Sequence, residues 1–380
     1  MSSAATTAEP LHAVISEVIA PAAAEVDRDG SFPRAGIDAL AKAGILGATS
    51  APELGGGGGG VAEVAMIVER LAGACSSTAM VVLMHFSAVS VLEAHGPREV
   101  REAIARGEHL STLAFSEAGS RAHFWAPTST AAVAPDGVRL DARKSWITSA
   151  GEADSYVWSS RPLAEPGPMT LWLVPADAAG LSAPGAFDGL GLRGNASRPV
   201  TAAGVVVPAG AMLGADGSGL DIALSMALPT FLVGSAAFSV GLAQALLDEA
   251  AAHLTATRLE HLDATLAEQP ATRAEYAALL TRAAEARAFL ADTLAALAAG
   301  REDAMLRVLQ VKAVAGEAAA EVADGVMRVC GGAAFRKELG VERRFRDALA
   351  ARVMAPTTQA LRDFVGRAAL GQPLLDGAGA

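Results

Sequence analysis

The sequence predicts a mainly helical α+β protein with an N-terminal helical domain (residues 1–108), a central β-barrel-like domain (109–215) and a C-terminal four-helix bundle (216–380). Apolar residues recur at helical spacing before residue 106 and again after residue 216. Between these two blocks, short β-rich runs alternate with turn residues. A chain of 380 residues also exceeds the usual size of one hydrophobic core, so several packed domains are expected.

Composition excludes several classes of protein. With 52% hydrophobic residues the chain can bury a large core, so a disordered protein is not expected. A net charge of −11 argues against nucleic acid or an anionic membrane as the main partner, because both need basic patches. The N-terminus lacks the features of a signal peptide, and apolar runs such as Ala79–Val91 are shorter than a bilayer span. We therefore expect a cytoplasmic protein.

The two cysteines, Cys75 and Cys330, are far apart in the sequence and lie in apolar surroundings. They offer neither zinc-binding spacing nor a disulfide framework. We expect two buried thiols and no metal site.

The helices of the first domain are predicted from apolar positions at helical spacing. They are expected at residues 12–26, 35–46, 61–74 and 77–95. Gly and Pro signals separate them, including the glycine run Gly55–Gly60. A phosphate-binding loop would need Lys and Ser/Thr after these glycines, but Val61–Ala62–Glu63 follow. A flexible connection between helices is therefore the better interpretation.

The central domain and the bundle follow from a change of pattern. Strands are expected within residues 130–150, 155–160, 169–176 and 199–210. The step Pro135–Asp136–Gly137 predicts a hairpin between two alternating segments. Longer helical patterns return at residues 225–261, 272–300 and 304–332, with the lengths of an antiparallel bundle.

Two short motifs of the central domain carry the chemical information. FSEAG (Phe115–Gly119) and KSWITSA (Lys144–Ala150) place hydroxyl side chains and an indole on neighbouring strands. Hydroxyls can hydrogen-bond to the polar edge of an isoalloxazine ring, and the indole can pack against the ring system. The two motifs therefore favour a flavin site.

Together with three further segments, these motifs resemble the acyl-CoA dehydrogenase family over nearly the whole chain. The further segments are PELGG (Pro52–Gly56), the stretch from GLGLRGNASRPV to VVVPAGAMLG (189–214), and CGGAAFRKELGVERRFRDA (330–348). Each is weak alone, but their order and spacing are specific. The resemblance implies three domains, helical, β-barrel-like and bundle, with FAD bound between them and across a subunit interface.

The resemblance also implies cofactor-binding residues in this chain. Ser116 would contact the flavin pyrimidine, and Phe115 beside it is counted as cofactor-binding. Trp146 and Thr148 would flank the ring near N5, although Trp146 taken alone could simply pack in the core. Toward the rest of FAD, the resemblance assigns Arg258, Arg328, Gly331, Gly332, Thr357 and Gln359. Arg258 would keep a phosphate contact although the family's phenylalanine-glycine is missing after it. Arg328 replaces a glutamine and could pair with a pyrophosphate. FMN, or a transiently bound reduced flavin, stays open as an alternative.

The pattern breaks at the catalytic base. Members of the family remove the α-proton of the acyl thioester with a glutamate, because a weak carbon acid needs a positioned carboxylate. In VMAPTTQ (353–359) Ala355 occupies that position, where it could only contact substrate. The alternative base position, on the first bundle helix, is occupied by Phe231. Neither of the two positions therefore carries a side chain that could act as a base.

Four other residues are candidates for roles around this gap. His85 lies on an apolar helix whose counterpart is near the floor of the active-site cavity, so it is either a catalytic group or a core histidine. Glu117 is either catalytic or, more in keeping with its family counterpart, a structural carboxylate of the turn. Arg121 and His123 would lie where the substrate tail enters and could contact phosphate, or they are solvated surface residues.

Three functions remain open from the sequence. The first is a flavin-dependent dehydrogenase of an acyl-CoA or acyl-carrier-protein thioester, with a relocated or absent base and with electron-transfer flavoprotein as acceptor. The second is a flavin monooxygenase served by a flavin reductase, which would make His85, Ser116 and Ser149 relevant, although no histidine occurs in VMAPTTQ. The third is a non-catalytic member of the family. A homodimer or homotetramer is implied by the resemblance alone.

Overall fold

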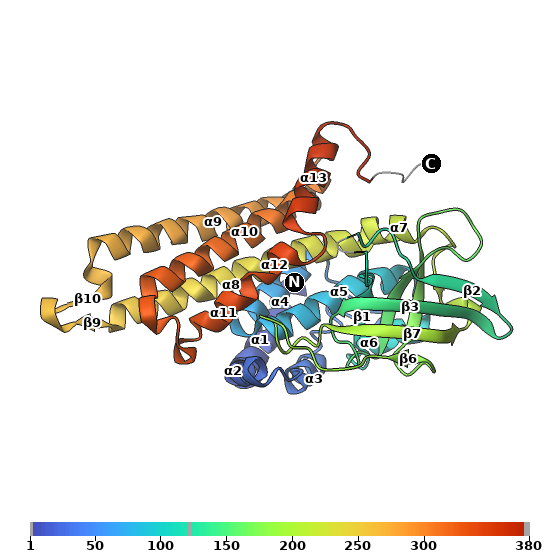
Figure 1. The fold of residues 1–380 in the computed structure, drawn as a ribbon, viewed down its shortest axis with the longest axis horizontal. Helices are drawn as coiled ribbons and strands as arrows, with labels where there is room; N and C mark the ends of the chain where they lie inside the picture. Colours follow the sequence, from blue (N-terminus) through green and yellow to red (C-terminus); the bar gives the residue numbers. More distant parts are fainter. Residues whose placement is uncertain (1–2, 121–122, 376–380) are drawn as a thin grey trace.

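The computed structural model describes residues 3–120 and 123–375, and it confirms the predicted fold class. Figure 1 shows an elongated molecule in which α8, α9 and α10 run side by side along the long axis and the β-sheets lie at one end. The N-terminal helices pack between these two parts, against α8. In space the N-terminal helices therefore lie between the bundle and the sheets, although they come first along the chain.

Six helices form the N-terminal part, and a π-helical segment (Ile15–Ile19) joins the first two. They are α1 (Ser3–Val14), α2 (Ala20–Asp29), α3 (Arg34–Lys42), α4 (Val61–Ala74), α5 (Ser76–His95) and α6 (Arg98–Ala105). Helix α5 is apolar on nearly all sides because it is buried on nearly all sides.

The glycine run between α3 and α4 is fixed in place, contrary to the flexible connection that we predicted. The backbone N–H groups of Gly57 and Gly59 donate to the carbonyls of Gly47 (3.0 Å) and Ala48 (2.9 Å). A Cβ on Gly57 would lie 2.6 Å from the Ala48 carbonyl oxygen, so a side chain there would force the two backbone segments apart. Close approach of backbone explains the glycines.

The central part consists of two four-stranded sheets, with strand orders β1-β4-β5-β8 and β2-β3-β7-β6. The strands are β1 (Ser111–Ala114), β2 (Thr130–Ala134), β3 (Gly137–Ile147), β4 (Ser155–Ser160), β5 (Thr170–Pro175), β6 (Leu181–Ser182), β7 (Arg198–Val207) and β8 (Met212–Leu213). Ala134 pairs with Gly137, which confirms the hairpin predicted at this turn. The register of β3 against β7 shifts between Lys144 and Ile147, so β3 carries a bulge at Trp146.

The C-terminal part contains three long helices and several short elements. They are α7 (Gly219–Ile222), α8 (Leu228–Ala256), β9 (Arg258–Leu259), β10 (Ala264–Thr265), α9 (Pro270–Ala299), α10 (Ala304–Cys330), α11 (Val341–Ala348), α12 (Ala350–Val353) and α13 (Thr358–Ala369). The short α11, α12 and α13 pack along α10 and complete the bundle. The β9–β10 hairpin lies at the end of the bundle remote from the sheets (Figure 1).

Two helical stretches have the length and apolar composition of a membrane span. They are α5 (Ser76–His95) and the continuous stretch Gly219–Ala256, in which a π-helical segment (Ala223–Ala227) joins α7 to α8. In the fold, 78% and 83% of their most apolar windows are buried by other parts of the chain. Burial in the protein core accounts for their composition.

Helix α11 connects all three parts of the molecule. The Arg346 guanidinium donates to both carboxylate oxygens of Asp27 in α2 (2.9 and 2.5 Å) and to the carbonyl of Leu190 in the central part (3.0 Å). The neighbouring Asp347 carboxylate is buried and accepts from the Leu192 N–H at 2.7 Å. These charge-assisted contacts hold the bundle against both other parts.

Candidate flavin and substrate site

Backbone strain is concentrated in two segments that face each other. Among the described residues, five that are not glycine have a positive φ: Trp146, Ser149, Leu192, Ala196 and Asp263. The first four belong to segments 146–149 and 192–196, which pair through Ser149 N–H to the Asn195 carbonyl (2.9 Å). Such conformations cost about 1–3 kcal/mol each and cluster at functional sites. The pair of segments is therefore a candidate site on conformational grounds.

Trp146 is the most distinctive residue of this site. Its φ of 58° places it in the bulge of β3, and 72% of the residue is exposed. A bulge re-aims a side chain, and a largely exposed indole offers a flat surface for a planar ligand. Thr148 lies two residues further on, buried, with its hydroxyl 3.3 Å from that of Ser197.

The structure brings the FSEAG and KSWITSA segments together. The Ser145 N–H donates to the Ser116 carbonyl, and the Ala118 N–H donates to the Arg143 carbonyl, both at 3.0 Å. Ser116 is half-buried, while Phe115 is buried at the end of β1. Ser116, Trp146 and Thr148 therefore come from segments that pair directly.

Glu117 has a structural role, and its geometry argues against the catalytic one. Its carboxylate is buried, accepts from the Lys144 ammonium at 2.6 Å, and is bonded by the N–H and hydroxyl groups of Thr128 and Ser129. Burial alone would raise the pKa of Glu117, but the Lys144 charge and these hydrogen bonds outweigh it and lower the pKa to about 2. A carboxylate so fully occupied has no oxygen left to take a substrate proton.

Both ring nitrogens of His85 likewise form hydrogen bonds with the backbone. Its Nε2 lies 3.1 Å from the Leu46 carbonyl, and its Nδ1 accepts from the Ser111 N–H at 3.2 Å. The neutral ring with its proton on Nε2 satisfies both contacts. Burial lowers the pKa of His85 to about 4. The geometry therefore favours the core histidine over the catalytic group, with His85 linking α5 to β1.

His123 belongs to an aromatic cluster that joins the central part to α13. The rings of His123 and Trp125 are 4.9 Å apart, and Trp125 lies 5.3 Å from Phe364 of α13. Edge-to-face contacts of this kind add roughly 0.5–1.5 kcal/mol beyond their buried area. His123 is exposed, and Arg121, the other predicted substrate contact, lies outside the described residues.

The loop expected to carry the base contains no titratable side chain between Val353 and Gln359. Ala355 is half-buried, and its peptide bond to Pro356 is cis. Phe231, at the alternative base position, is buried in α8. The structure thus offers a hydrocarbon surface at both positions.

A buried lysine forms hydrogen bonds with the backbone of this loop. The Lys312 ammonium of α10 donates to the carbonyls of Ala351 (2.8 Å), Met354 (3.1 Å) and Pro356 (2.9 Å). Burial lowers the pKa of Lys312 to about 7. We did not predict this contact, although a lysine on the buried face of a helix is a visible signal in the sequence.

The predicted phosphate-contacting arginines already have carboxylate partners. Arg258 pairs with Asp263, while Arg328 pairs with Glu275 at 2.6 Å and with Asp324. All these side chains are exposed, so the pairs contribute little to stability and can exchange partners.

The predicted cofactor residues fall into two groups within the chain. Gly331 and Gly332 follow α10 and lie, with Arg258 and Arg328, at the bundle end remote from the sheets (Figure 1). Trp146 and Ser116 lie in the central part at the other end. Thr357 caps α13 by accepting from the Ala360 N–H at 3.2 Å, and Gln359 is exposed one turn later. One chain does not bring the two groups together.

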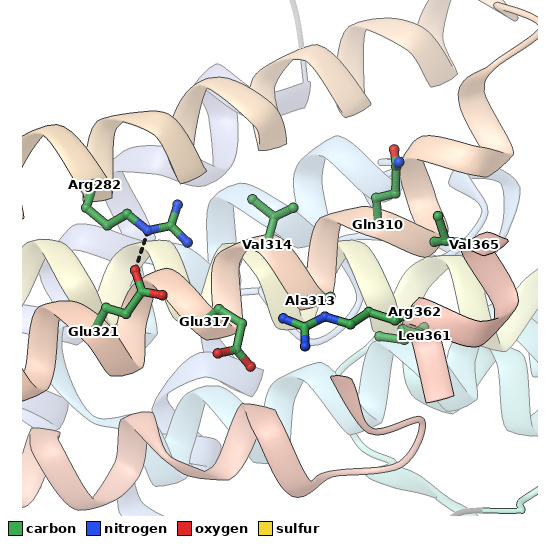
Figure 2. Close-up of a pocket in the computed structure, with 9 residues that line it drawn as sticks. All are labelled: Arg282, Gln310, Ala313, Val314, Glu317, Glu321, Leu361, Arg362 and Val365. Atoms are coloured by element: carbon green, nitrogen blue, oxygen red, sulfur yellow. Dashed lines mark hydrogen bonds and ion pairs between the residues drawn. The ribbon is translucent and has the colours of Figure 1, made fainter. Parts of the chain in front are cut away.

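A separate pocket of about 390 Å³ lies between α9, α10 and α13. Figure 2 shows that charged side chains of all three helices surround an apolar wall. The lining residues are Arg282, Gln310, Ala313, Val314, Glu317, Glu321, Leu361, Arg362 and Val365. The Arg282 guanidinium donates from Nε to the Glu321 carboxylate at 2.5 Å. None of the predicted site residues lines this pocket.

Comparison with known proteins places this geometry in a family. Residues 4–107, 112–205 and 217–370 match the acyl-CoA dehydrogenase N-terminal, middle and C-terminal domains. Cyclohex-1-ene-1-carbonyl-CoA dehydrogenase of Geobacter metallireducens is 31% identical over 379 residues, covering 96% of this chain and 97% of that protein. The chain belongs to the acyl-CoA dehydrogenase family. Human short-chain specific acyl-CoA dehydrogenase is 28% identical, covering 90% of this chain and 84% of that protein.

Solved structures of acyl-CoA dehydrogenases share the fold. Butyryl-CoA dehydrogenase from Megasphaera elsdenii superposes with a TM-score of 0.90 at 22% identity, covering 97% of this chain and 98% of that one. KijD3, solved in complex with FMN and dTDP-3-amino-2,3,6-trideoxy-4-keto-3-methyl-D-glucose, has a TM-score of 0.85 at 26% identity, covering 98% and 95%.

Acyl-CoA dehydrogenases are FAD-dependent oxidoreductases acting on CH–CH groups, and the residues of this chain fit that cofactor. The indole of Trp146 is available to a planar ring, and Ser116 and Thr148 lie on the segments around it. At Gly331 and Gly332, an added Cβ would meet no heavy atom within 4 Å, so the backbone is open to a ligand. Besides the Lys312 contacts, the sequence motifs missed the backbone strain of the site, including that at Leu192 and Ala196, which no local pattern signals.

Proposed function

We propose that this protein is a flavin-dependent acyl-CoA dehydrogenase in which no side chain acts as a dedicated base for the α-proton. The observation that carries the proposal is Trp146 of KSWITSA, a largely exposed residue held in a strained bulge next to the pairing with FSEAG. A strained conformation persists only where the surroundings enforce it, and a ligand platform is a reason to enforce it.

FAD, when bound, supplies the hydride acceptor for the β-carbon of the thioester. Trp146, Ser116 and Thr148 would hold and orient the ring system. Ala355 and Phe231 would then present methyl and phenyl surfaces to the acyl chain. What the residues do not supply is an acceptor for the α-proton.

The absent base has a kinetic consequence. Positioned acid–base groups contribute about 10²–10⁴-fold to proton transfer. Because His85 and Glu117 are buried and fully hydrogen-bonded, neither replaces the missing carboxylate. We therefore propose slow dehydrogenation, with water accepting the α-proton.

The substrate carrier and partners are part of the proposal. The curated relatives are named for CoA thioesters, which supports acyl-CoA. The net charge of −11 would repel a carrier protein of acidic composition. Electron-transfer flavoprotein is the proposed electron acceptor. A homodimer or homotetramer is supported by the two separated groups of cofactor residues, which could meet only across a subunit interface.

The test is an anaerobic titration of the flavin-loaded protein with a panel of acyl-CoAs, followed by visible absorption. Slow bleaching of the flavin band with at least one thioester supports dehydrogenation. A stable band with every thioester contradicts the proposal and leaves oxygen chemistry or a non-catalytic protein.

Flavin-dependent monooxygenation is the second candidate. KijD3, which shares the fold over nearly the whole chain, was solved with FMN and a nucleotide sugar rather than an acyl-CoA. Oxygen chemistry on reduced flavin needs no carboxylate at position 355. Consumption of oxygen that depends on a flavin reductase and on an added substrate would favour this function over dehydrogenation.

A further inference from the structure

We propose that Lys312 is a positioning residue of the site, whose ammonium fixes the backbone on both sides of residue 355. The proposal rests on the proposed function for its catalytic consequence, but its structural part stands alone. Lys312 is buried, 1% exposed, on the face of α10 that also buries Val308 and Ala315. Among the described residues it has no carboxylate partner, so its three carbonyl contacts are what compensate its burial.

The acceptors identify what the lysine does. The carbonyls of Ala351 and Met354 lie at the C-terminal end of α12, where helix geometry leaves carbonyls without intrahelical donors. Lys312 supplies those donors from another helix and adds a positive charge at the negative end of the helix dipole. Its third acceptor, the Pro356 carbonyl, lies beyond residue 355.

This arrangement clamps one residue between two held peptides. Met354 and Pro356 flank Ala355, and both of their carbonyls bind the same nitrogen. Downstream, the Thr357 hydroxyl fixes the start of α13. The direction of the side chain at position 355 is therefore set by Lys312.

The number of acceptors favours the charged form. An ammonium has three N–H donors and matches three carbonyls at 2.8–3.1 Å, whereas a neutral amine has two. An arginine keeps the charge, but no single nitrogen of its planar guanidinium carries three N–H donors that could reach the three carbonyls. Methionine keeps most of the packing and supplies no donor.

Hydrogen exchange of the flavin-loaded protein tests the structural part. In K312M, a peptide covering residues 350–357 should exchange at least about tenfold faster, because the three charge-assisted hydrogen bonds of Lys312 are lost. Peptides of α8 and of the central strands should exchange as in the wild type. K42M is the matched control, since Lys42 is exposed at the end of α3, and it should leave residues 350–357 unchanged.

Unchanged exchange of residues 350–357 in folded K312M, or an equal increase in every peptide, would overturn the assignment. If K312M does not yield soluble protein, K312R takes its place and should show a smaller increase confined to the same peptide. An increase spread over α8 in K312R would overturn the assignment as well.

The catalytic consequence is read in an A355E background, which restores a carboxylate. If A355E raises the rate of flavin bleaching by acyl-CoA, adding K312R should remove at least about tenfold of kcat while KM changes less than about threefold. An undiminished kcat in the double variant would overturn the positioning role. If A355E gains no activity, the proposed function fails, and the exchange experiment still decides the role of Lys312.

Discussion

The Nζ of Lys144 and the Oε1 of Glu117 lie 2.6 Å apart where neither side chain reaches solvent. The ammonium also donates to the carbonyl and the hydroxyl of Ser159, at 2.7 and 2.9 Å. Burial lowers the pKa of Lys144 to about 8, so the ammonium remains charged at neutral pH. The pair joins the FSEAG turn to β3 and β4, directly behind the bulge that presents Trp146.

Breaking this pair should destabilise the protein without touching the ligand surface. K144M leaves the Glu117 carboxylate buried and unpaired, which costs about 3–5 kcal/mol in comparable cases. Urea unfolding followed by circular dichroism measures the loss. The double variant K144M/E117L removes both charges and should recover part of it; a double variant no more stable than K144M would contradict this explanation.

Acid should weaken the same pair over a defined range. The pKa of Glu117 falls from its ordinary 4.5 to about 2 in the folded protein, so the unfolded chain binds a proton first as pH falls. The contribution of Glu117 is complete above pH 4.5 and is lost as the pH falls toward 2. Unfolding free energies of wild type and E117Q, measured across that range, should therefore converge. A constant difference between the two would be inconsistent with the lowered pKa.

Trp146 should matter for the flavin and little for the fold. Because the residue is 72% exposed, W146A removes hardly any core packing, and the change in unfolding free energy should stay within about 1 kcal/mol. Loss of the stacking surface should weaken flavin retention at least about fivefold, read as the ratio of flavin to protein absorbance after gel filtration. W146F should keep much of the retention. Normal flavin content in W146A would remove the indole from the ring site.

His85 should affect stability rather than chemistry. H85A leaves the Leu46 carbonyl and the Ser111 N–H without the imidazole as their hydrogen-bond partner, and it leaves a cavity. Together these losses should lower the free energy of unfolding by about 2–4 kcal/mol. Turnover per flavin-loaded, folded molecule should stay within about twofold of wild type. Abolished turnover in protein with normal flavin content and near-normal stability would restore His85 as a catalytic group.

The fold and the flavin segments could be predicted because their signals are local. FSEAG and KSWITSA are contiguous, and the hairpin after Ala134 is encoded by its own turn residues. The roles of His85 and Lys312 could not be predicted, because their partners lie 26 to 44 residues away in the chain. Helical periodicity predicts that such a residue is buried, but not which backbone groups form hydrogen bonds with it.

The sequence was also informative about what is missing. The substitution at Ala355 is a single position, and its meaning depends on the surrounding loop keeping its place. The structure adds that Lys312 still holds this loop, as if a side chain at position 355 were to be presented. That combination, an intact support and an alanine, is what makes the missing base testable.

The most direct measurement compares wild type with A355E in anaerobic stopped-flow reduction of the flavin by the same acyl-CoA. The account predicts slow bleaching in the wild type and bleaching at least about 100-fold faster in A355E, because a positioned carboxylate contributes about 10²–10⁴-fold. A355Q, which has the same shape and no basic oxygen of comparable strength, should stay near the wild-type rate. Equal and rapid bleaching of wild type and A355E would show that the wild type already has a base, and would contradict the account.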